Sequence, residues 1–185
     1  MRGHWKKKVR EVDPKKLVFV DESGVNTAMT RTRGRAPRGE RVEGSVPQGH
    51  WRTLTMLGAL RLDGVAAAAT VDAATDTDVF QAFVGNALVP ALRPGDVVVW
   101  DNLSPHKAEQ VRQEIGRAGA GLMPLPPYSP DLSPIEPCWS KVKQHVRDAG
   151  PRSVEALGAA AAEGFAGVTA ADARGWFEHC GYCVH

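Results

Sequence analysis

Two aspartates each follow a short apolar run, and their positions point to acid chemistry. Asp21 ends the stretch KLVFVD at residues 16–21, and Asp101 follows the stretch VVVW at residues 97–100. Continuous apolar runs of this length are typical of strands that are buried on both faces. Sites in open α/β sheets form at the carboxyl ends of the strands. If these two strands are neighbours, both carboxylates face one crevice, where a divalent cation would offset their repulsion.

The residues alone also allow a structural interpretation, because an aspartate at a strand end often only caps the next turn. A third acid, Glu136, has a similar ambiguity. Ser133 and Glu136 have the spacing of a helix capping box, and Pro134 fits the first helical position. The predicted helix nevertheless places Glu136 in line with two cations, Lys143 and Arg147, that could hold a phosphate backbone. Capping and catalysis are both compatible with this position.

The basic residues are concentrated at one end of the chain. Residues 1–52 contain thirteen Lys and Arg against six Asp and Glu, whereas residues 53–185 contain ten against fifteen. This asymmetry is expected of a protein that grips a polyanion with one part and acts on it with another, although surface charges also cluster by chance. With 185 residues, 43% of them hydrophobic, the chain can bury one core and is expected to form one domain. No apolar run reaches the roughly 20 residues that cross a membrane.

The pattern of apolar residues predicts a sheet covered by helices. A hairpin is expected over residues 51–72, with its turn at the Leu-Asp-Gly of residues 62–64. Hairpin strands followed by strands that alternate with helices favour an α/β or α+β sheet layered by helices. The further predicted elements are a strand over residues 120–125 and helices over 75–92, 105–117, 135–147, 153–166 and 170–180.

A long polar segment, residues 22–50, separates the first strand from the hairpin. It is far longer than an ordinary connection, and loops of this length are usually functional or disordered. It carries five arginines, which are Arg31, Arg33, Arg35, Arg38 and Arg41.

Several sequence blocks together resemble a known family. The stretches LVFVDESG, GHWRTLTMLGAL, LRPGDVVVWDNLSPHK and LPPYSPDLSPIEPCWSKVK are similar to the bacterial insertion-sequence transposases of the 630 family, within the mariner superfamily. The resemblance runs from about residue 12 to the C-terminus. Thirty-four residues lie between Asp101 and Glu136, which is the spacing that this superfamily favours.

The resemblance implies a fold and an activity. It makes Asp21, Asp101 and Glu136 the D-D-E triad of a ribonuclease-H-like α/β fold, with a mixed five-stranded sheet flanked by helices and a long basic insertion between the first two strands. The implied reaction is metal-dependent phosphodiester cleavage at transposon ends, followed by strand transfer into target DNA. Two Mg²⁺ ions, or Mn²⁺ in their place, are the implied cofactors, and three carboxylates suit them. A related nuclease without strand transfer, or a non-catalytic remnant that binds DNA or full-length transposase, stays an alternative.

The same resemblance implies DNA contacts. The arginine-rich segment is similar to the clamp loop that bridges protomers and DNA in mariner transposases, so an active homodimer is expected. A merely solvated loop is the other interpretation. Asn102 and His106 match a family block and are expected to shape the site or touch DNA, although His106 could equally be a surface residue. The residues expected to bind DNA are Arg31, Arg33, Arg35, Arg38, Arg41, His106, Lys107, Lys143 and Arg147.

The domain organisation follows from the resemblance as well. Residues 16–185 are expected to form the catalytic domain, and residues 1–15 a basic tail or the end of a missing linker. The resembled transposases read their terminal repeats with a helix-turn-helix region, which needs at least two packed helices that this segment cannot supply. We therefore expect weak, unselective DNA binding and dependence on an upstream-frame helix-turn-helix protein.

Other candidate residues are assigned structural roles. Glu22 follows Asp21 on a strand and is expected to point to the opposite face. Asp131 is expected to fix the proline-rich loop through turn hydrogen bonds. The terminal HCGYCVH stretch offers His179, Cys180, Cys183 and His185, but a structural zinc site normally takes two separated ligand pairs, so zinc is not expected here. Three late cysteines do not form a disulfide framework, which favours the cytoplasm.

Overall fold

The computed structural model describes residues 2–73, 76–101 and 105–184, without the side chains of 105–108. Its centre is a mixed five-stranded sheet, as predicted, and the strand order is β3-β2-β1-β4-β5. Strand β2 is antiparallel to both β1 and β3, and β4 and β5 run parallel to β1. The strands are β1 (Leu17–Asn26), β2 (Thr53–Arg61), β3 (Gly64–Val71), β4 (Val97–Trp100) and β5 (Gly121–Pro124).

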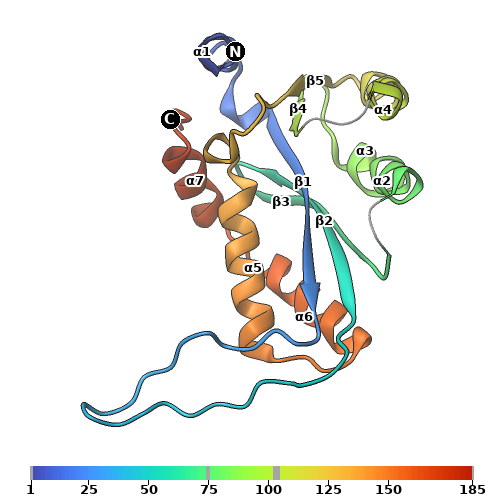
Figure 1. The fold of residues 1–185 in the computed structure, drawn as a ribbon. Helices are drawn as coiled ribbons and strands as arrows, with labels where there is room; N and C mark the ends of the chain where they lie inside the picture. Colours follow the sequence, from blue (N-terminus) through green and yellow to red (C-terminus); the bar gives the residue numbers. More distant parts are fainter. Residues whose placement is uncertain (1, 74–75, 102–104, 185) are drawn as a thin grey trace.

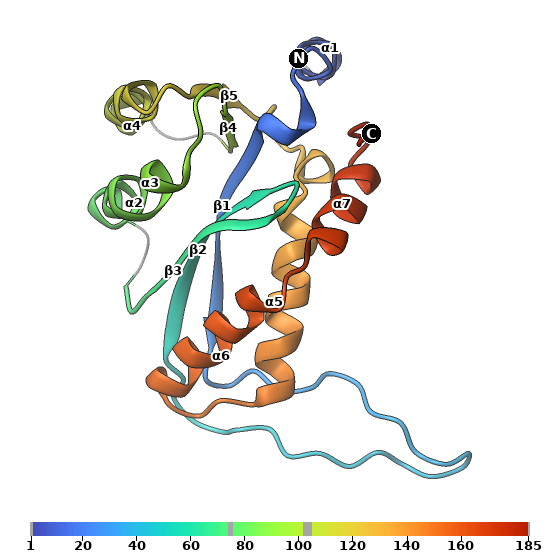
Figure 2. The same cartoon turned by 180° about the vertical axis from the view of Figure 1, so that it is seen from behind.

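Helices cover both faces of this sheet (Figures 1 and 2). Leu17 and Phe19 of β1 face one core, whereas Val18 and Val20 face the other. This double burial explains why the strand is a continuous apolar run. One face carries α5 (Ile135–Ala149), α6 (Val154–Ala166) and α7 (Ala170–His179), and the other carries α2 (Thr77–Phe83), the π-helical turn η2 (Val84–Leu88), α3 (Val89–Ala91) and α4 (Pro105–Arg117).

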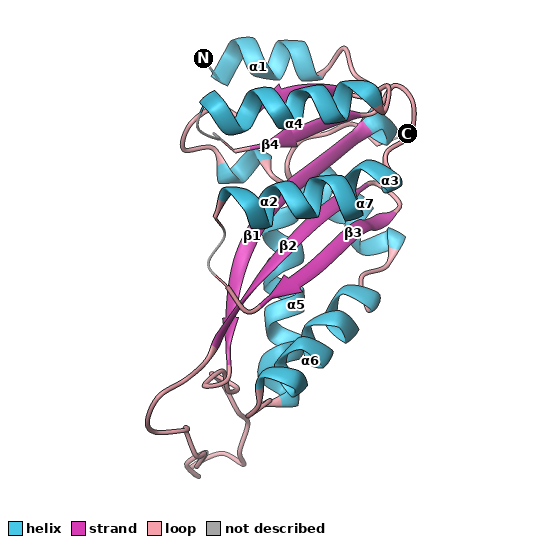
Figure 3. Cartoon of the chain, turned by 90° about the vertical axis from the view of Figure 1, so that its right-hand side faces the viewer, coloured by secondary structure: helices cyan, strands magenta, loops and turns pink. Residues whose placement is uncertain are grey.

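The first strand is longer than predicted. We expected it to end at Asp21, but β1 continues to Asn26 because its second half pairs with β2 alone, from Glu22 opposite Leu57 to Asn26 opposite Thr53. Figure 3 shows this two-stranded extension reaching below the rest of the sheet. The apolar run stops at Val20, where the pairing with β4 also stops. The sequence pattern therefore marks the end of double burial, not the end of the strand.

The hairpin of β2 and β3 is confirmed, with a turn at Leu62 and Asp63. The helix predicted over residues 75–92 is present as the consecutive segments α2, η2 and α3. Asp76 caps its N-terminus, because Asp76 Oδ1 accepts a hydrogen bond from the Val79 backbone N–H at 2.9 Å.

The N-terminal segment contains a helix where a basic tail was expected. Helix α1 (Arg2–Val9) buries Trp5 and Val9 in the core on the side of α5 and α7. These two residues are four apart, so they lie on one side of the helix while its lysines face solvent. Arg2 also pairs with Asp131 beyond β5. None of the helices in the described ranges is long and apolar enough to cross a membrane.

The segment between β1 and β2 extends from the body as a long arm (Figure 1). Its stem is closed where the Thr27 N–H donates to the Arg52 carbonyl at 3.0 Å and the Arg52 N–H donates to Thr27 Oγ1 at 3.1 Å. Arg152 Nη1 donates to the carbonyls of Thr27 and Met29, both at 3.1 Å. Beyond this stem, residues 31–53 are exposed.

Candidate active site

Asp21, Asp101 and Glu136 line one cavity of about 440 Å³. The sheet register explains why the two aspartates meet, because Val20 pairs with Trp100 on the parallel neighbour and each aspartate is the next residue. Glu136 lies in the first turn of α5, whose upper end meets the sheet at this point (Figure 1). The prediction that the two strand-end aspartates face one crevice is confirmed, and Glu136 joins them from a helix.

Trp139 holds Asp21 in place, which the sequence analysis missed. The Trp139 Nε1–H donates to Asp21 Oδ2 at 2.9 Å across the face of the sheet. Gly58 pairs directly with Asp21 on β2, and a β-carbon at Gly58 would lie 2.7 Å from Trp139 Cη2. The absence of a side chain at Gly58 therefore makes room for the indole. A glycine inside a strand often marks such a close approach, and this was the available signal.

The three acids repel one another electrostatically. Burial raises the pKa of Asp21, which the Trp139 hydrogen bond and the Glu22 backbone N–H partly offset, while the charges of Glu22 and Asp101 raise it further. Burial also raises the pKa of Glu136, followed by the charge of Asp21, whereas Lys143 lowers it and Asp101 raises it. The charged forms are thus disfavoured in the fold, so the stability that these two groups contribute falls as the pH rises through their raised pKa values. A bound cation would offset this cost.

The capping-box interpretation of Glu136 is wrong. Helix α5 has Pro134 at its N-cap position, and no side chain forms a cap hydrogen bond there. The Glu136 backbone N–H donates to the Ser133 carbonyl at 3.1 Å, but Ser133 itself is buried. The Glu136 side chain is exposed on the wall of the cavity. Its carboxylate therefore lines the cavity and does not cap the helix.

The chemistry of the three side chains fits a hard divalent cation, because all of them are carboxylates and Mg²⁺ and Mn²⁺ prefer oxygen ligands. Within the part of the chain that is described, no three His, Cys, Asp or Glu residues form a group that could hold a metal ion as they stand. Asp101 and Glu136 are exposed, so turning their side chains inward requires no repacking of the core. The three residues therefore fit a divalent ion, because all of them are carboxylates and all of them line the same cavity.

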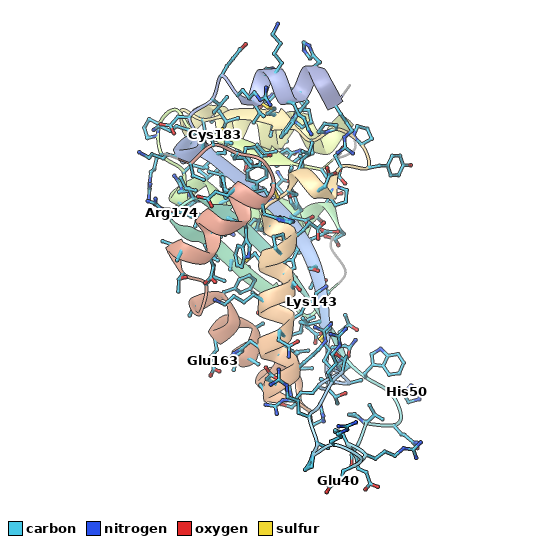
Figure 4. All side chains as sticks on the ribbon, turned by 90° about the vertical axis from the view of Figure 1, so that its left-hand side faces the viewer. Glu40, His50, Lys143, Glu163, Arg174 and Cys183 are labelled. Carbon is cyan, nitrogen blue, oxygen red and sulfur yellow. The ribbon has the colours of Figure 1, made fainter. Side chains whose placement is uncertain are left out.

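The basic residues expected to bind DNA lie in different places. Lys143 is close enough to Glu136 to lower its pKa, and Arg147 follows one turn later on α5. Arg31 instead pairs with Asp148 at 2.6 Å, at the other end of that helix. Glu136 and Asp148 are about 18 Å apart along the helix, at about 1.5 Å per residue. Figure 4 shows Lys143 on α5. The arm, with Glu40 and His50, lies beyond the far end of this helix.

The other expected contacts are less well defined. Arg33, Arg35, Arg38 and Arg41 are exposed on the arm, away from the cavity. His106 and Lys107 belong to α4, but their side chains lie outside the described part of the structure, as does Asn102 altogether.

The residues assigned structural roles also have defined positions. Asp131 pairs with Arg2 of α1, so it fixes that helix where a turn contact was expected. Glu22 is exposed. At the C-terminus, Cys180 is half-buried and Cys183 is exposed, and His185 lies outside the described residues.

A family model described as DDE superfamily endonuclease matches residues 16–158, which is most of the chain. The chain belongs to the DDE superfamily endonuclease family. This match spans β1, β4 and the start of α5, the elements that carry the three acids. The family assignment therefore rests on the segments that build the cavity.

Curated proteins that are similar to this chain include a transposase. The Tcb2 transposase of a Caenorhabditis briggsae transposable element is 32% identical over 81 residues, which are 42% of this chain and 30% of that protein. The human histone-lysine N-methyltransferase SETMAR is 43% identical over 42 residues, which are 23% of this chain and 6% of that protein. This chain thus corresponds to only part of each relative.

Solved structures of the Mos1 transposase share the fold of this endonuclease domain. The Mos1 paired-end complex with the left transposon end superposes with a TM-score of 0.72 at 17% identity, covering 96% of this chain and 55% of that chain. The Mos1 catalytic domain with raltegravir and Mn gives 0.67 at 17% identity, covering 95% and 82%. The predicted ribonuclease-H-like fold is confirmed.

The contact between Gly58 and Trp139 predicts non-additive stabilities. Gly58→Ala should lower the free energy of unfolding by about 1–3 kcal/mol, because the new methyl group overlaps the indole. Trp139→Phe removes the overlapping ring atom, so the double variant should be more stable than the sum of the two single changes indicates. Chemical denaturation of the four proteins measures the coupling.

The matched control is Gly24→Ala on the same sheet, where a β-carbon would come no closer than 3.8 Å to Thr53 Cγ2. It should leave stability nearly unchanged. Additive effects of Gly58→Ala and Trp139→Phe would contradict the close approach.

Proposed function

We propose that this chain is the catalytic domain of a DNA transposase related to the bacterial insertion-sequence transposases of the 630 family. It would cut phosphodiester bonds at transposon ends and join the released strands to target DNA. The observation that carries the proposal is the single cavity lined by Asp21, Asp101 and Glu136, in a chain of the DDE endonuclease family. The similarity to the Tcb2 and Mos1 transposases supports the transposition role.

The proposed cofactors are two Mg²⁺ ions, with Mn²⁺ as a substitute, and Asp21, Asp101 and Glu136 would hold them. Bound there, such ions would supply Lewis-acid activation of the attacking oxygen and stabilisation of the departing one. The donor set supports this, as do Mos1 paired-end complexes with Mn and with Mg. The chain itself contributes the orientation of Asp21, through the Trp139 hydrogen bond and the space at Gly58.

The proposed substrate is DNA, which approaches the cavity along α5. Lys143 lies about two turns along α5 from Glu136, close enough for its charge to lower the pKa of that carboxyl, and can pair with a phosphate beside the reacting one. The exposed arm arginines would hold DNA further away, or bridge to a second copy in an active homodimer. Mos1 complexes that contain a transposon end support the DNA role. The full proposed set is Arg31, Arg33, Arg35, Arg38, Arg41, His106, Lys107, Lys143 and Arg147.

Recognition of the transposon ends is proposed to come from elsewhere. The chain spans 30% of the Tcb2 transposase and 55% of the Mos1 chain, so the whole proteins contain further parts. A helix-turn-helix region, in a longer chain or in an upstream-frame partner, would supply the sequence preference.

A strand-joining assay tests the proposal. A labelled duplex with a free 3′-hydroxyl is incubated with supercoiled plasmid, Mg²⁺ or Mn²⁺ and the protein. We expect label covalently attached to the plasmid, since the same carboxylates would serve cutting and joining. Nicked plasmid without joined label would indicate a nuclease without strand transfer. Binding without nicks or joined products would indicate the non-catalytic remnant.

The arm arginines predict the salt dependence of DNA binding. Replacing Arg33, Arg35 and Arg38 with alanine should weaken binding to any DNA sequence. Each lost phosphate contact should reduce the slope of log K against log salt by roughly 0.9, so the three together reduce it by roughly 2.7. Fluorescence anisotropy over a series of salt concentrations measures this slope.

The matched control replaces three exposed arginines on the helical layers, Arg112, Arg117 and Arg174, and changes the net charge equally. Arg174 lies on α7, on the outer face of the body (Figure 4). The control should leave the slope close to that of the unmodified protein. Equal slopes for both triple variants would show that the arm contacts no phosphates.

A further inference from the structure

Tyr128 combines a strained backbone with full exposure. Its φ is +53°, and it is the one non-glycine residue with a positive φ in the ranges that the structure describes. Its side chain is 96% exposed, although tyrosine has a large apolar ring. A left-handed backbone is unfavourable for a residue with a β-carbon and persists where the surrounding structure imposes it, often at functional sites. Neither the backbone nor burial explains a tyrosine at this position.

The loop around Tyr128 constrains the backbone that carries the exposed ring. Residues 126–130 read Pro-Pro-Tyr-Ser-Pro, and each proline fixes its own φ. Ser129 is buried, and its Oγ donates to the Pro127 carbonyl at 3.2 Å. The Tyr128 ring is therefore presented to solvent by a constrained backbone, so little backbone freedom remains to be lost when the ring binds something.

Tyr128 stands at the cavity that contains the three acids. It lines the same 440 Å³ cavity as Asp21, Asp101 and Glu136. The Leu125 N–H donates to the Trp100 carbonyl at 2.8 Å, which ties the start of this loop to the end of β4, next to Asp101. Any phosphodiester held at the carboxylates therefore has the Tyr128 ring beside it.

We infer that Tyr128 stacks on an unpaired nucleobase of the nucleotide next to the reacting phosphodiester. The inference rests on the proposed function and deepens it. An exposed aromatic face binds bases by stacking, whatever their identity, because every base has a flat π-face. A base inside an intact duplex has both faces covered by its neighbours. The base on which Tyr128 stacks is therefore at a strand end or turned out of the DNA duplex.

Fluorescence of 2-aminopurine tests this inference. The probe is a short duplex with one unpaired 2-aminopurine next to a nick, studied without divalent metal so that it stays intact. Binding of the unmodified protein should quench the probe by stacking. Tyr128→Ala and Tyr128→Gly should both lose the quenching and bind the probe roughly 5- to 150-fold more weakly. Tyr128→Phe should keep both, since the ring stacks without its hydroxyl.

Comparing Tyr128→Ala with Tyr128→Gly separates the effect of losing the ring from the effect of the strained backbone. Glycine accepts a positive φ at no steric cost, whereas alanine does not, so equal losses in both variants assign the effect to the ring. Trp51→Ala is the matched control, because Trp51 is also aromatic and exposed (60%) but lies on the arm. It should leave quenching unchanged, and none of the Tyr128 variants should weaken binding of the fully paired duplex.

Three outcomes would overturn the inference. Quenching that survives in Tyr128→Ala would show that the ring does not stack on the base. Recovery of binding in Tyr128→Gly would show that only the backbone matters. A change in self-association on sedimentation, with unchanged probe binding, would assign the ring to a second copy of the chain. Strand joining by the unmodified protein, measured in parallel, shows whether the proposed function stands when the inference fails.

Discussion

Asp101→Asn should reduce DNA cleavage by more than about a hundredfold, because loss even of an outer-shell partner of a metal ligand typically costs 10- to 100-fold. Asp21→Asn and Glu136→Gln should have effects of the same order, since the three acids line one cavity and are proposed to act together. A double variant should therefore be little worse than a single one. Nicking of supercoiled plasmid in Mg²⁺ measures the rates.

The control for these substitutions is Glu22→Gln. Glu22 neighbours Asp21 in sequence, is exposed, and raises the pKa of Asp21 by its charge. The variant makes the same charge change as Glu136→Gln without touching the proposed ligands, so its rate should stay close to that of the unmodified protein. Cleavage that persists in all three triad variants would mean that the cavity is not the active site.

Asp96→Ala should lower the free energy of unfolding by about 3–5 kcal/mol, because it removes the buried carboxylate nearest the buried Arg61 guanidinium and leaves only the exposed Asp63, 3.9 Å from Arg61 Nε. Arg61 and Asp96 are 2% and 0% exposed in their side chains, and Arg61 Nη1 lies 2.9 Å from Asp96 Oδ2. Arg61 Nη2 also donates to the Ala91 carbonyl at 2.9 Å, so this pair joins the end of β2 to the segment before β4. Typical domains are stable by only 5–15 kcal/mol, so the loss is large.

The control is the exposed pair of Arg93 with Asp63, whose side chains are 60% and 56% exposed. Arg93→Ala should change stability by less than about 1 kcal/mol, as is usual for surface ion pairs. Urea denaturation compares the two variants. Equal small losses would show that the buried pair contributes no more than an exposed one.

The sequence predicts that Asp21 and Asp101 lie close together because a parallel strand that is buried on both faces is a continuous apolar run. The apolar runs end where double burial ends, and that point coincides with the site. The second half of β1 carries no such mark, since it is held by hydrogen bonds to β2 and Val25 is its one buried residue. Its existence could not be inferred from hydrophobicity.

The missed features depend on contacts between distant residues. The sequence shows Trp139 only as one member of the apolar face of its helix. No neighbouring residue indicates that the indole N–H donates to Asp21, 118 residues away. Asp96 lies in a turn-like Arg-Pro-Gly-Asp stretch, which suggests exposure, yet its partner is on β2. Trp5 and Val9 form too short a stripe to identify α1 as a packed helix.

The central claim is that Asp21, Asp101 and Glu136 form one divalent-metal site, and calorimetric titration with Mn²⁺ tests it most directly. The unmodified protein should bind Mn²⁺, and Asp21→Asn, Asp101→Asn and Glu136→Gln should each lose this binding while Glu22→Gln retains it. Because binding requires ionised carboxylates and the pKa values of Asp21 and Glu136 are raised, affinity should fall as the pH is lowered through those values. Mn²⁺ binding that is unchanged in the three triad variants would contradict the claim.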